Sequence, residues 1–323
     1  MIQQILIKIL RIFYRLLTKI IYLIIPILSR ILIFFRLNSR VINQLNKLRY
    51  ESHKIYDHRN LISSLLIDKK LIALDVGAQG GFNGNIFSKK YDNFFSPIMV
   101  EPIQNEAEKL SNKNYKIINK GLWSSNCKKK LHILKNRTGS SSMYIPNEET
   151  FDLYNLKKKN FSLFHVSNIV DIECTTIKES LNNLKVKNLD FLKIDTQGAE
   201  LEILKGIGEY FPLLIKIEVQ ILPMYKNVPN WSELINCLYN LNYMTCEWVN
   251  IGTHATRSPV EMDMLLIPNF LTDFGKKIIL SRENEFISLM LIFGQIKLLQ
   301  IISIKLNFSI NSKIQNLKDD FFH

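Results

Sequence analysis

The chain has 323 residues, of which 47% are hydrophobic, and a formal net charge of +13. This length and apolar content suffice for one large globular domain with additions. Its four cysteines (Cys127, Cys174, Cys237 and Cys246) have no CxxC spacing, which argues against a zinc site and against a disulfide framework. Residues 1–50 hold nine Lys or Arg and no acid, so the rest carries only +4. A general nucleic-acid-binding surface is therefore not expected.

The first 37 residues combine Ile, Leu and Phe with regularly spaced basic residues. At about 100° per residue, the basic residues fall on one narrow face of a helix. They are Lys8, Arg11, Arg15, Lys19 and Arg30. This pattern predicts a helix lying on an anionic membrane, at its cytoplasmic face. A spanning helix, which Pro26 and Arg30 would interrupt, and a helix packed on the protein's own core are the alternatives. Without anchoring, we expect a cytoplasmic protein.

A helical connector is expected over residues 38–70, and Leu71 opens a region where strand and helix patterns alternate. Such alternation predicts a mostly parallel sheet. The predicted strands are Leu71–Val76, Ser96–Val100, Lys116–Asn119, Phe191–Ile194 and Leu213–Val219. Helices are predicted at Gln104–Ser111, Ala199–Leu204 and Trp231–Leu241. Two further strands, Thr245–Val249 and Met262–Ile267, have no helix pattern between them, which predicts an antiparallel pair at one sheet edge.

The segment LIALDVGAQGG (Leu71–Gly81) is an apolar strand followed by a glycine turn. Glycine allows a tight turn and close approach of a ligand to the backbone. A helix starting within Asn83–Tyr91 would direct free N–H groups at that ligand. The glycine spacing differs from GxGxxG, and Asp75 would repel a pyrophosphate. A ligand with a cationic amino group, such as S-adenosylmethionine, fits better; an ordinary glycine-rich turn is the alternative.

Two further acids end predicted strands. Glu101 lies 26 residues after Asp75, where an acid can accept hydrogen bonds from ribose hydroxyls. Its alternative role is a surface acid before Pro102. Asp195 ends the strand Phe191–Ile194, at the edge where α/β sheets bind ligands. It is the candidate general base or acceptor-positioning acid, with helix capping as the alternative.

Glu218, inside a strand, could reach the acceptor or pair with Lys216 or Arg257. His254 is a weaker candidate base on a loop, with a solvated histidine as the alternative. No HxH or HExxH grouping occurs, so no metal is expected. The polar stretch of residues 136–160 is too long for a simple connection and is either a lid or a solvated insertion. The chain after residue 270 is rich in Ile and Leu, and its packing partner is left open.

The chain resembles the FkbM-type methyltransferases over Leu71–Pro268. The motifs that carry the resemblance are DVGAQGG (Asp75–Gly81), VEP (Val100–Pro102), KGLWSS (Lys120–Ser125), SSSM (Ser140–Met143), LKIDTQGAELEILKG (Leu192–Gly206), IKIEV (Ile215–Val219) and DMLLIP (Asp263–Pro268). The resemblance implies a Rossmann-like fold, S-adenosylmethionine as donor, and usually O-methylation of sugars or polyketide-type products. Two departures are Gln79, where the family usually has Asn, and TTIKESL (Thr175–Leu181), where it often shows TLDxxL.

Together these observations predict an α/β fold of the class I methyltransferase type. We expect a doubly wound, mostly parallel sheet with an antiparallel closing pair, plus helical extensions at both ends. The expected segments are residues 1–37, 38–70, 71–270 and 271–323. The expected cofactor-binding residues are Asp75, Gly77, Gln79, Gly81 and Glu101, with Asp195 catalytic.

The expected reaction is O-methylation of a sugar, glycan or glycolipid, with no nucleic-acid partner. A nucleic-acid methyltransferase is disfavoured because the (D/N)PP(Y/F) turn of the amino-methylating type is missing. A membrane-attached binding module with a non-catalytic pocket is the other alternative. The acceptor, the oligomeric state and the role of residues 271–323 do not follow from the sequence.

Overall fold

The computed structural model describes residues 57–78, 80–82, 86–113, 115–154, 158–250 and 260–317, with residues 16, 19–20, 24–28 and 30–31 of the N-terminal arm. The chain divides into two units, Met1–Glu51 and Ser52–His323. The described residues of the first unit are helical. Within the described parts, no helix is long and apolar enough to cross a membrane.

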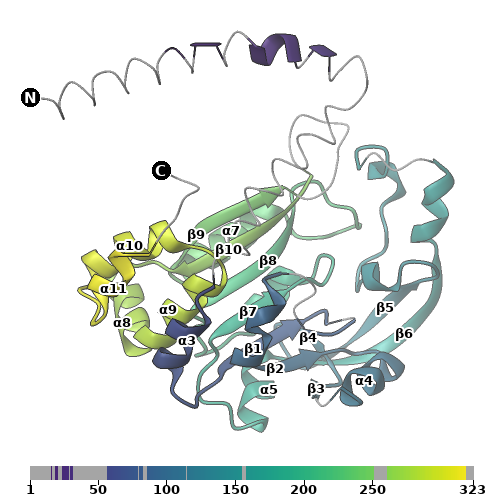
Figure 1. Ribbon diagram of the computed structural model, residues 1–323. Helices are drawn as coiled ribbons and strands as arrows, with labels where there is room; N and C mark the ends of the chain where they lie inside the picture. Colours follow the sequence, from purple (N-terminus) through teal and green to yellow (C-terminus); the bar gives the residue numbers. More distant parts are fainter. Residues whose placement is uncertain are drawn as a thin grey trace, which may run out of the picture. The chain divides into compact units, whose positions relative to one another are not determined.

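The centre of the second unit is a seven-stranded sheet in the order β3-β2-β1-β7-β8-β10-β9 (Figure 1). The strands β3, β2, β1, β7 and β8 run parallel, whereas β10 is antiparallel to both β8 and β9. Their bounds are β1 Leu71–Val76, β2 Phe95–Val100, β3 Lys116–Ile118, β7 Phe191–Ile194, β8 Leu214–Gln220, β9 Tyr243–Asn250 and β10 Glu261–Pro268. The predicted doubly wound sheet with an antiparallel closing pair is confirmed.

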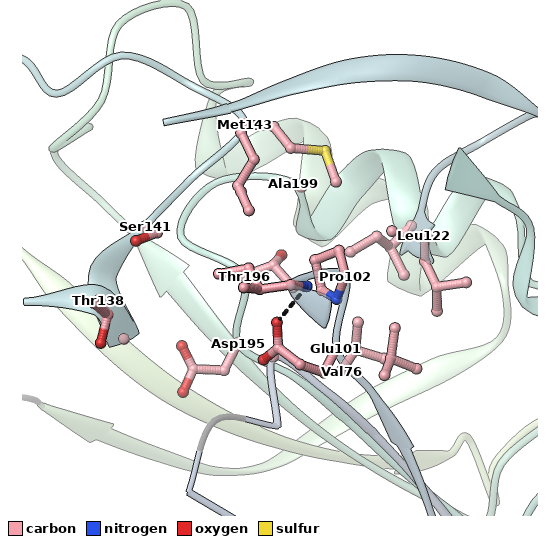
Figure 2. Close-up of a pocket in the computed structure, with 17 residues that line it drawn as sticks. Val76, Glu101, Pro102, Leu122, Thr138, Ser141, Met143, Asp195, Thr196 and Ala199 are labelled. Atoms are coloured by element: carbon pink, nitrogen blue, oxygen red, sulfur yellow. Dashed lines mark hydrogen bonds between the residues drawn. The ribbon is translucent and has the colours of Figure 1, made fainter. Parts of the chain in front are cut away.

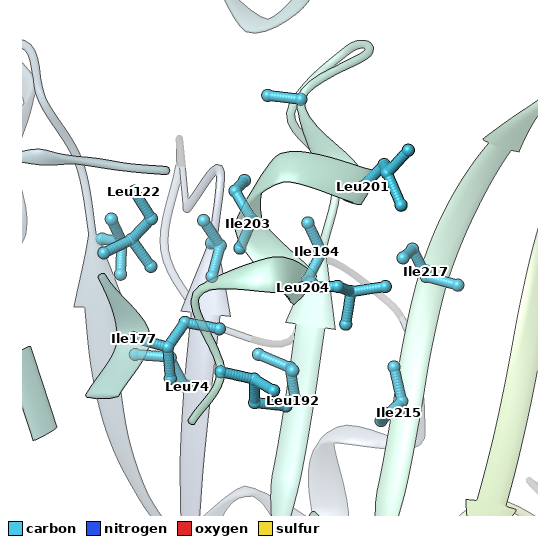
Figure 3. Packing of buried hydrophobic residues seen from close by; sticks show 14 of the residues in the cluster. Leu74, Leu122, Ile177, Leu192, Ile194, Leu201, Ile203, Leu204, Ile215 and Ile217 are labelled. Carbon is cyan, nitrogen blue, oxygen red and sulfur yellow. The ribbon is translucent and has the colours of Figure 1, made fainter. Parts of the chain in front are cut away.

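One face of this sheet packs against the helices that connect its strands. These are α5 (Ile177–Asn183), α6 (Glu200–Lys205) and α7 (Trp231–Asn240). Thr176 caps α5 and Asn230 closes a capping box on α7, so both helices begin at polar residues that satisfy free N–H groups. Figure 3 shows the core between α6 and the strands, which includes Leu74, Leu192, Ile194, Leu204 and Ile217.

The opposite face packs against helices from both ends of the unit (Figure 1). They are α3 (Arg59–Leu66), α8 (Asp273–Ser281), α9 (Glu283–Ile292), α10 (Ile296–Lys305) and α11 (Asn311–Gln315). In α9 every residue from Phe286 to Ile292 is buried, as expected of a helix that is apolar on all sides. The described part of the C-terminal extension therefore completes the core beneath the sheet.

A smaller sheet, in the order β4-β6-β5, extends from the main one. Its strands are β4 (Gly121–Leu122), β5 (Cys127–Leu134) and β6 (Val166–Thr175). The long connection between β5 and β6 contains the 3-10 helices η3 (Thr138–Ser140), η4 (Glu148–Thr150) and η5 (Lys158–Phe164). Single bridges His132–Ser142 and Pro146–Tyr225 fasten it to the rest of the fold.

The helix expected within Asn83–Tyr91 is not found in the described part of that stretch. Residues 86–88 are irregular and a 3-10 helix, η2 (Lys89–Phe94), follows; residues 83–85 lie outside the description. Phe87 is 1% exposed and stacks on Phe95, with ring centroids 4.9 Å apart. Burial of this ring in the core between the sheet and the helices α3 and α9 holds the chain close to the sheet. The remaining described helix, α4 (Gln104–Ser111), has the predicted bounds.

Candidate active site

A pocket lies where β1, β2 and β7 end at their carboxyl termini. It encloses about 650 Å³, including its open mouth, and Gly77, Glu101 and Asp195 line it, one at the end of each strand. Figure 2 shows the Glu101 and Asp195 carboxylates on one side of this space and Met143 on the other. Parallel strands bring their carboxyl ends to one edge of the sheet. One glycine and two acids that are far apart in sequence therefore meet at the pocket.

The connection between β5 and β6 supplies the other wall of the pocket. Thr138, Gly139, Ser141 and Met143 line it, all from the first part of the polar stretch 136–160. The Ser142 hydroxyl donates to the carbonyl of Gln197 at 2.7 Å, and Tyr144 N–H donates to Ser142 Oγ at 3.0 Å. These bonds hold the first part of the stretch against the segment that follows β7. Residues 138–143 therefore cover one side of the pocket, and we call them the cover.

Glu101 is buried without a basic partner among the described residues. The residue is 5% exposed, and its Oε1 accepts one hydrogen bond, from Ile103 N–H at 2.9 Å. Burial raises the pKa of Glu101 to about 7, with the nearby Glu106 adding to the effect. Burying a carboxylate costs free energy unless hydrogen-bond donors, such as those of a ligand, compensate for the lost water. Two vicinal hydroxyls of a ribose are suitable donors.

Asp75 lies behind the pocket wall and does not line it. Its side chain is 3% exposed, and its Oδ1 accepts from Lys193 Nζ at 3.0 Å. Burial alone would lower the pKa of Lys193, but the Asp75 and Asp195 carboxylates outweigh this and raise it. The negative charge of Asp75 is therefore compensated by Lys193 of β7. A direct cofactor contact of Asp75 stays a prediction.

The glycines of the turn after β1 differ in what surrounds them. Gly77 has φ +83°, and a Cβ there would lie 1.9 Å from the carbonyl oxygen of Asp195. Gly81 has φ +113° and faces Lys113 and Tyr115, outside the pocket lining. Gln79, predicted as a cofactor residue, lies outside the described residues. Of the predicted turn residues that the structure describes, Gly77 is the one that lines the pocket.

Asp195 follows β7 directly, and its side chain is 40% exposed at the pocket. The alternative role as a helix cap is not observed: the N-cap of α6 is Ala199, without a side-chain cap. The Glu200 carboxylate instead accepts from Thr196 N–H at 2.9 Å and from Gly198 N–H at 3.2 Å. Asp195 is thus free of α6 and available to a ligand.

Sequence reasoning missed two residues beside Asp195. Lys193 Nζ lies 3.7 Å from Asp195 Oδ2, and Gln197 Nε2 donates to Asp195 Oδ1 at 3.2 Å. A lysine inside an otherwise apolar strand was the available signal for the first. Glu218 stands behind Gln197 and not at the pocket lining, while His254 lies outside the described residues. In the described parts of the chain, no group of three or more His, Cys, Asp or Glu can hold a metal ion.

The fold and the pocket together are those of a Rossmann-like, class I methyltransferase. Residues 75–244, just over half of the chain, match the family model described as the methyltransferase FkbM domain. The chain belongs to this family, as its motifs predicted, and its methyl donor is S-adenosylmethionine.

Solved structures similar to this chain are distant methyltransferases. Precorrin-6y C5,15-methyltransferase from Geobacter metallireducens GS-15 is 12% identical (65% of this chain, 86% of that one, TM-score 0.30). A SAM-dependent methyltransferase from Aquifex aeolicus is also 12% identical (71% and 97%, TM-score 0.29). One from Clostridium acetobutylicum ATCC 824 is 7% identical (72% and 98%, TM-score 0.33). No curated protein gives a significant match.

The pocket residues fit this cofactor. Glu101 is a buried carboxylate with unused acceptor capacity, which the ribose hydroxyls would satisfy. Pro102, Ile103 and Leu122 offer apolar surface beside it for a flat base. Gly77 keeps the backbone at the end of β1 close to β7 and leaves no side chain in the way.

Proposed function

We propose that the protein methylates a hydroxyl group of a sugar, glycan or glycolipid. The observation that carries the proposal is the Asp195 carboxylate, which is partly exposed at the same pocket as Glu101. A carboxylate beside the cofactor suits an acceptor that must lose a proton. Members of the FkbM family usually O-methylate sugars or polyketide-type products, which supports a hydroxyl as acceptor, and of these two classes we propose the sugar.

S-adenosylmethionine would supply the methyl group from its sulfonium sulfur, and the neutral thioether that remains is a good leaving group. The protein then has to bind the donor, align the acceptor hydroxyl with the methyl group, and take the proton of that hydroxyl. Glu101 would hold the ribose, and Asp195 would accept the hydroxyl proton as the acceptor oxygen attacks. The cover from residues 138–143 would limit water at the pocket, because water competes with the acceptor.

We further propose that the arm, residues 1–37, binds an anionic membrane surface. The described apolar side chains of the arm support this, since they are about half exposed: Leu16 (55%), Ile20 (50%), Ile24 (52%) and Ile27 (61%). Each basic residue near an anionic surface contributes about 1 kcal/mol, and apolar burial adds to it. A lipid-linked glycan would then meet the enzyme on one surface, on the cytoplasmic side where we expect the donor.

The cofactor assignment is tested by calorimetry on the full-length protein in detergent. Glu101→Ala should weaken binding of S-adenosylmethionine and of its demethylated product roughly 10-fold or more, because two ribose hydroxyls lose their acceptor. Glu108→Ala, which removes an exposed carboxylate of α4 that accepts from Gln104, is the matched control and should bind normally. Binding of NAD without binding of S-adenosylmethionine would refute the assignment.

The acceptor is found by incubating labelled donor and full-length protein with cell-envelope glycan and lipid fractions. We expect label in a glycan or glycolipid fraction, in a form that withstands mild base as a methyl ether does and a methyl ester does not. Label confined to nucleic acid or protein would overturn the proposed acceptor class.

Membrane binding is tested by flotation with phosphatidylglycerol-containing vesicles. Changing Lys8, Arg11, Arg15 and Lys19 to Glu should release the protein, since roughly 4 kcal/mol of attraction is lost. The control changes four basic residues outside the arm, Lys128, Lys130, Lys178 and Lys187, to Glu and should still float. A wild-type protein that stays with the soluble fraction in the presence of vesicles refutes anchoring.

A further inference from the structure

Gln197 holds an unusual backbone conformation next to the reacting carboxylate. Its φ is +59°, in the left-handed region, and Gly198 follows with φ +116°. Glycine and asparagine adopt this region far more readily than glutamine. A non-glycine residue kept there next to an active site indicates that its side chain has a use.

The side chain of Gln197 connects two carboxyl groups. Its Nε2 donates to Asp195 Oδ1 at 3.2 Å and to Glu218 Oε1 at 2.8 Å. Tyr225 Oη lies 3.1 Å from Gln197 Oε1 and donates to the Ser140 carbonyl at 2.6 Å. Because the Asp195 carboxylate can only accept, the amide nitrogen of Gln197 must be the atom that faces it.

Behind Gln197 the network ends at Glu218, a second buried acid. Burial raises the pKa of Glu218 well above its usual range, and the neighbouring Asp195 and Glu261 carboxylates add to this effect. Burial and these neighbouring carboxylates therefore favour the protonated form of Glu218. Gln197 is 9% exposed, whereas the Asp195 side chain is 40% exposed, so Gln197 supports Asp195 from the protein side and leaves its other side open.

We propose that Gln197 is a positioning residue for methyl transfer: its amide fixes one oxygen of the Asp195 carboxylate so that the other faces the acceptor hydroxyl. Lys193, 3.7 Å from Asp195 Oδ2, limits rotation from the strand side. Ser142 Oγ donates to the Gln197 carbonyl at 2.7 Å, so the same residue also fastens the cover of the pocket. The inference rests on the proposed role of Asp195 as the group that takes the acceptor proton.

Two variants separate the side chain of Gln197 from its backbone. Gln197→Asn keeps an amide and tolerates the left-handed conformation, but it is one methylene too short to reach both carboxyl groups. Gln197→Gly removes the side chain and suits the backbone better than glutamine does, so it covers the case in which the Asn variant fails to fold. Gln104→Asn, a change at an exposed amide that contacts Glu108 on α4, is the matched control.

Thermal unfolding, S-adenosylmethionine affinity and turnover on the labelled acceptor fraction are measured for each variant. Both Gln197 variants should melt and bind the donor like wild type and turn over roughly 10- to 100-fold more slowly, because misplacement of a reacting group has this effect. The control should match wild type throughout. Wild-type turnover in either folded Gln197 variant would overturn the inference.

A spectroscopic test does not depend on the acceptor. In protein labelled with 15N-glutamine, the Gln197 side-chain amide, assigned by its loss in Gln197→Asn, should exchange its protons slowly and shift in Asp195→Ala. An amide that exchanges as fast as that of the exposed Gln104 would refute the positioning role. If wild type methylates none of the fractions, the proposed acceptor class fails while this test still decides the role of Gln197.

Discussion

The ends of β1 and β7 look alike in sequence and differ in the folded protein. Each is an apolar strand with an acid at its end and a glycine turn after it, DVGAQGG at Asp75 and DTQGA at Asp195. The Asp75 side chain is 3% exposed and paired with Lys193, whereas the Asp195 side chain is 40% exposed at the pocket. Asp75 lies within its strand, followed by Val76, while Asp195 lies one residue beyond Ile194.

The comparison shows that the position of an acid at a strand end does not by itself make the acid accessible to a ligand. Inside the strand, the alternation of side chains directs Asp75 toward the face where Lys193 stands on the neighbouring strand. Beyond the strand, Asp195 leaves the sheet and reaches the pocket. Glu101, at the end of β2, is a third case: it lines the pocket but is buried, and no basic side chain among the described residues pairs with it.

The largest expected effect is at Lys193. Lys193→Met leaves the Asp75 carboxylate buried without its cation, which should lower the free energy of unfolding by roughly 3–5 kcal/mol at pH 7. The loss should shrink toward pH 4, because burial already raises the pKa of Asp75 and the protonated form needs no cation. Urea unfolding at the two pH values measures this.

The control for this prediction is Lys205→Met. Lys205 pairs with Glu202 at 2.5 Å on the surface, where the side chain is 49% exposed. An exposed pair contributes about 1 kcal/mol or less. If Lys193→Met costs no more than the control, the Asp75–Lys193 pair is not what stabilises the end of β1.

The next effect concerns Glu101 and pH. Because its pKa is raised from 4.5 to about 7 in the folded state, its contribution to stability is full below pH 4.5 and is lost as pH rises through 7. The loss amounts to about 3 kcal/mol. Glu101→Gln does not titrate, so relative to wild type its free energy of unfolding should increase between pH 4.5 and 8. Parallel curves for the two proteins would show that Glu101 is solvated.

Asp195→Asn tests the other side of the comparison. The change keeps size and hydrogen bonding but removes basicity, so turnover should fall about 100-fold, equivalent to about 2.7 kcal/mol. Donor affinity and the free energy of unfolding should change little, in contrast to Lys193→Met. Steady-state kinetics and calorimetry on one preparation give both quantities. Wild-type turnover would assign Asp195 a structural role.

The smallest effect is expected in the glycine turn after β1. Gly80 has φ +93° and nothing within 4 Å of an added Cβ, so Gly80→Ala should cost only about 1–2 kcal/mol of backbone strain. Gly77→Ala is the contrast and should cost more, because its Cβ would lie 1.9 Å from the Asp195 carbonyl oxygen. Equal unfolding midpoints for the two variants would mean that the ends of β1 and β7 are less closely packed than described.

The sequence alone determined the class of fold and pointed to three residues that line the pocket, Gly77, Glu101 and Asp195. Mostly apolar runs predicted β1 and β7 with their observed bounds, since strands buried on both faces are largely apolar. The pairing of two late strands without a helix between them predicted the antiparallel edge. Glu101 and Asp195 were recognised because a strand's carboxyl end is a local feature, readable from the residues around it.

Only the tertiary structure decided which acids face the pocket and what supports them. The partner of Asp75 is 118 residues away, and the register of β1 against β7 brings the two together. The burial of α9 beneath the sheet and the joining of residues 138–143 to the pocket likewise depend on contacts between distant segments. Local sequence patterns specify strands, turns and the buried faces of these elements. The pairing of distant strands decides which residue a charged side chain contacts, and therefore which role that side chain can have.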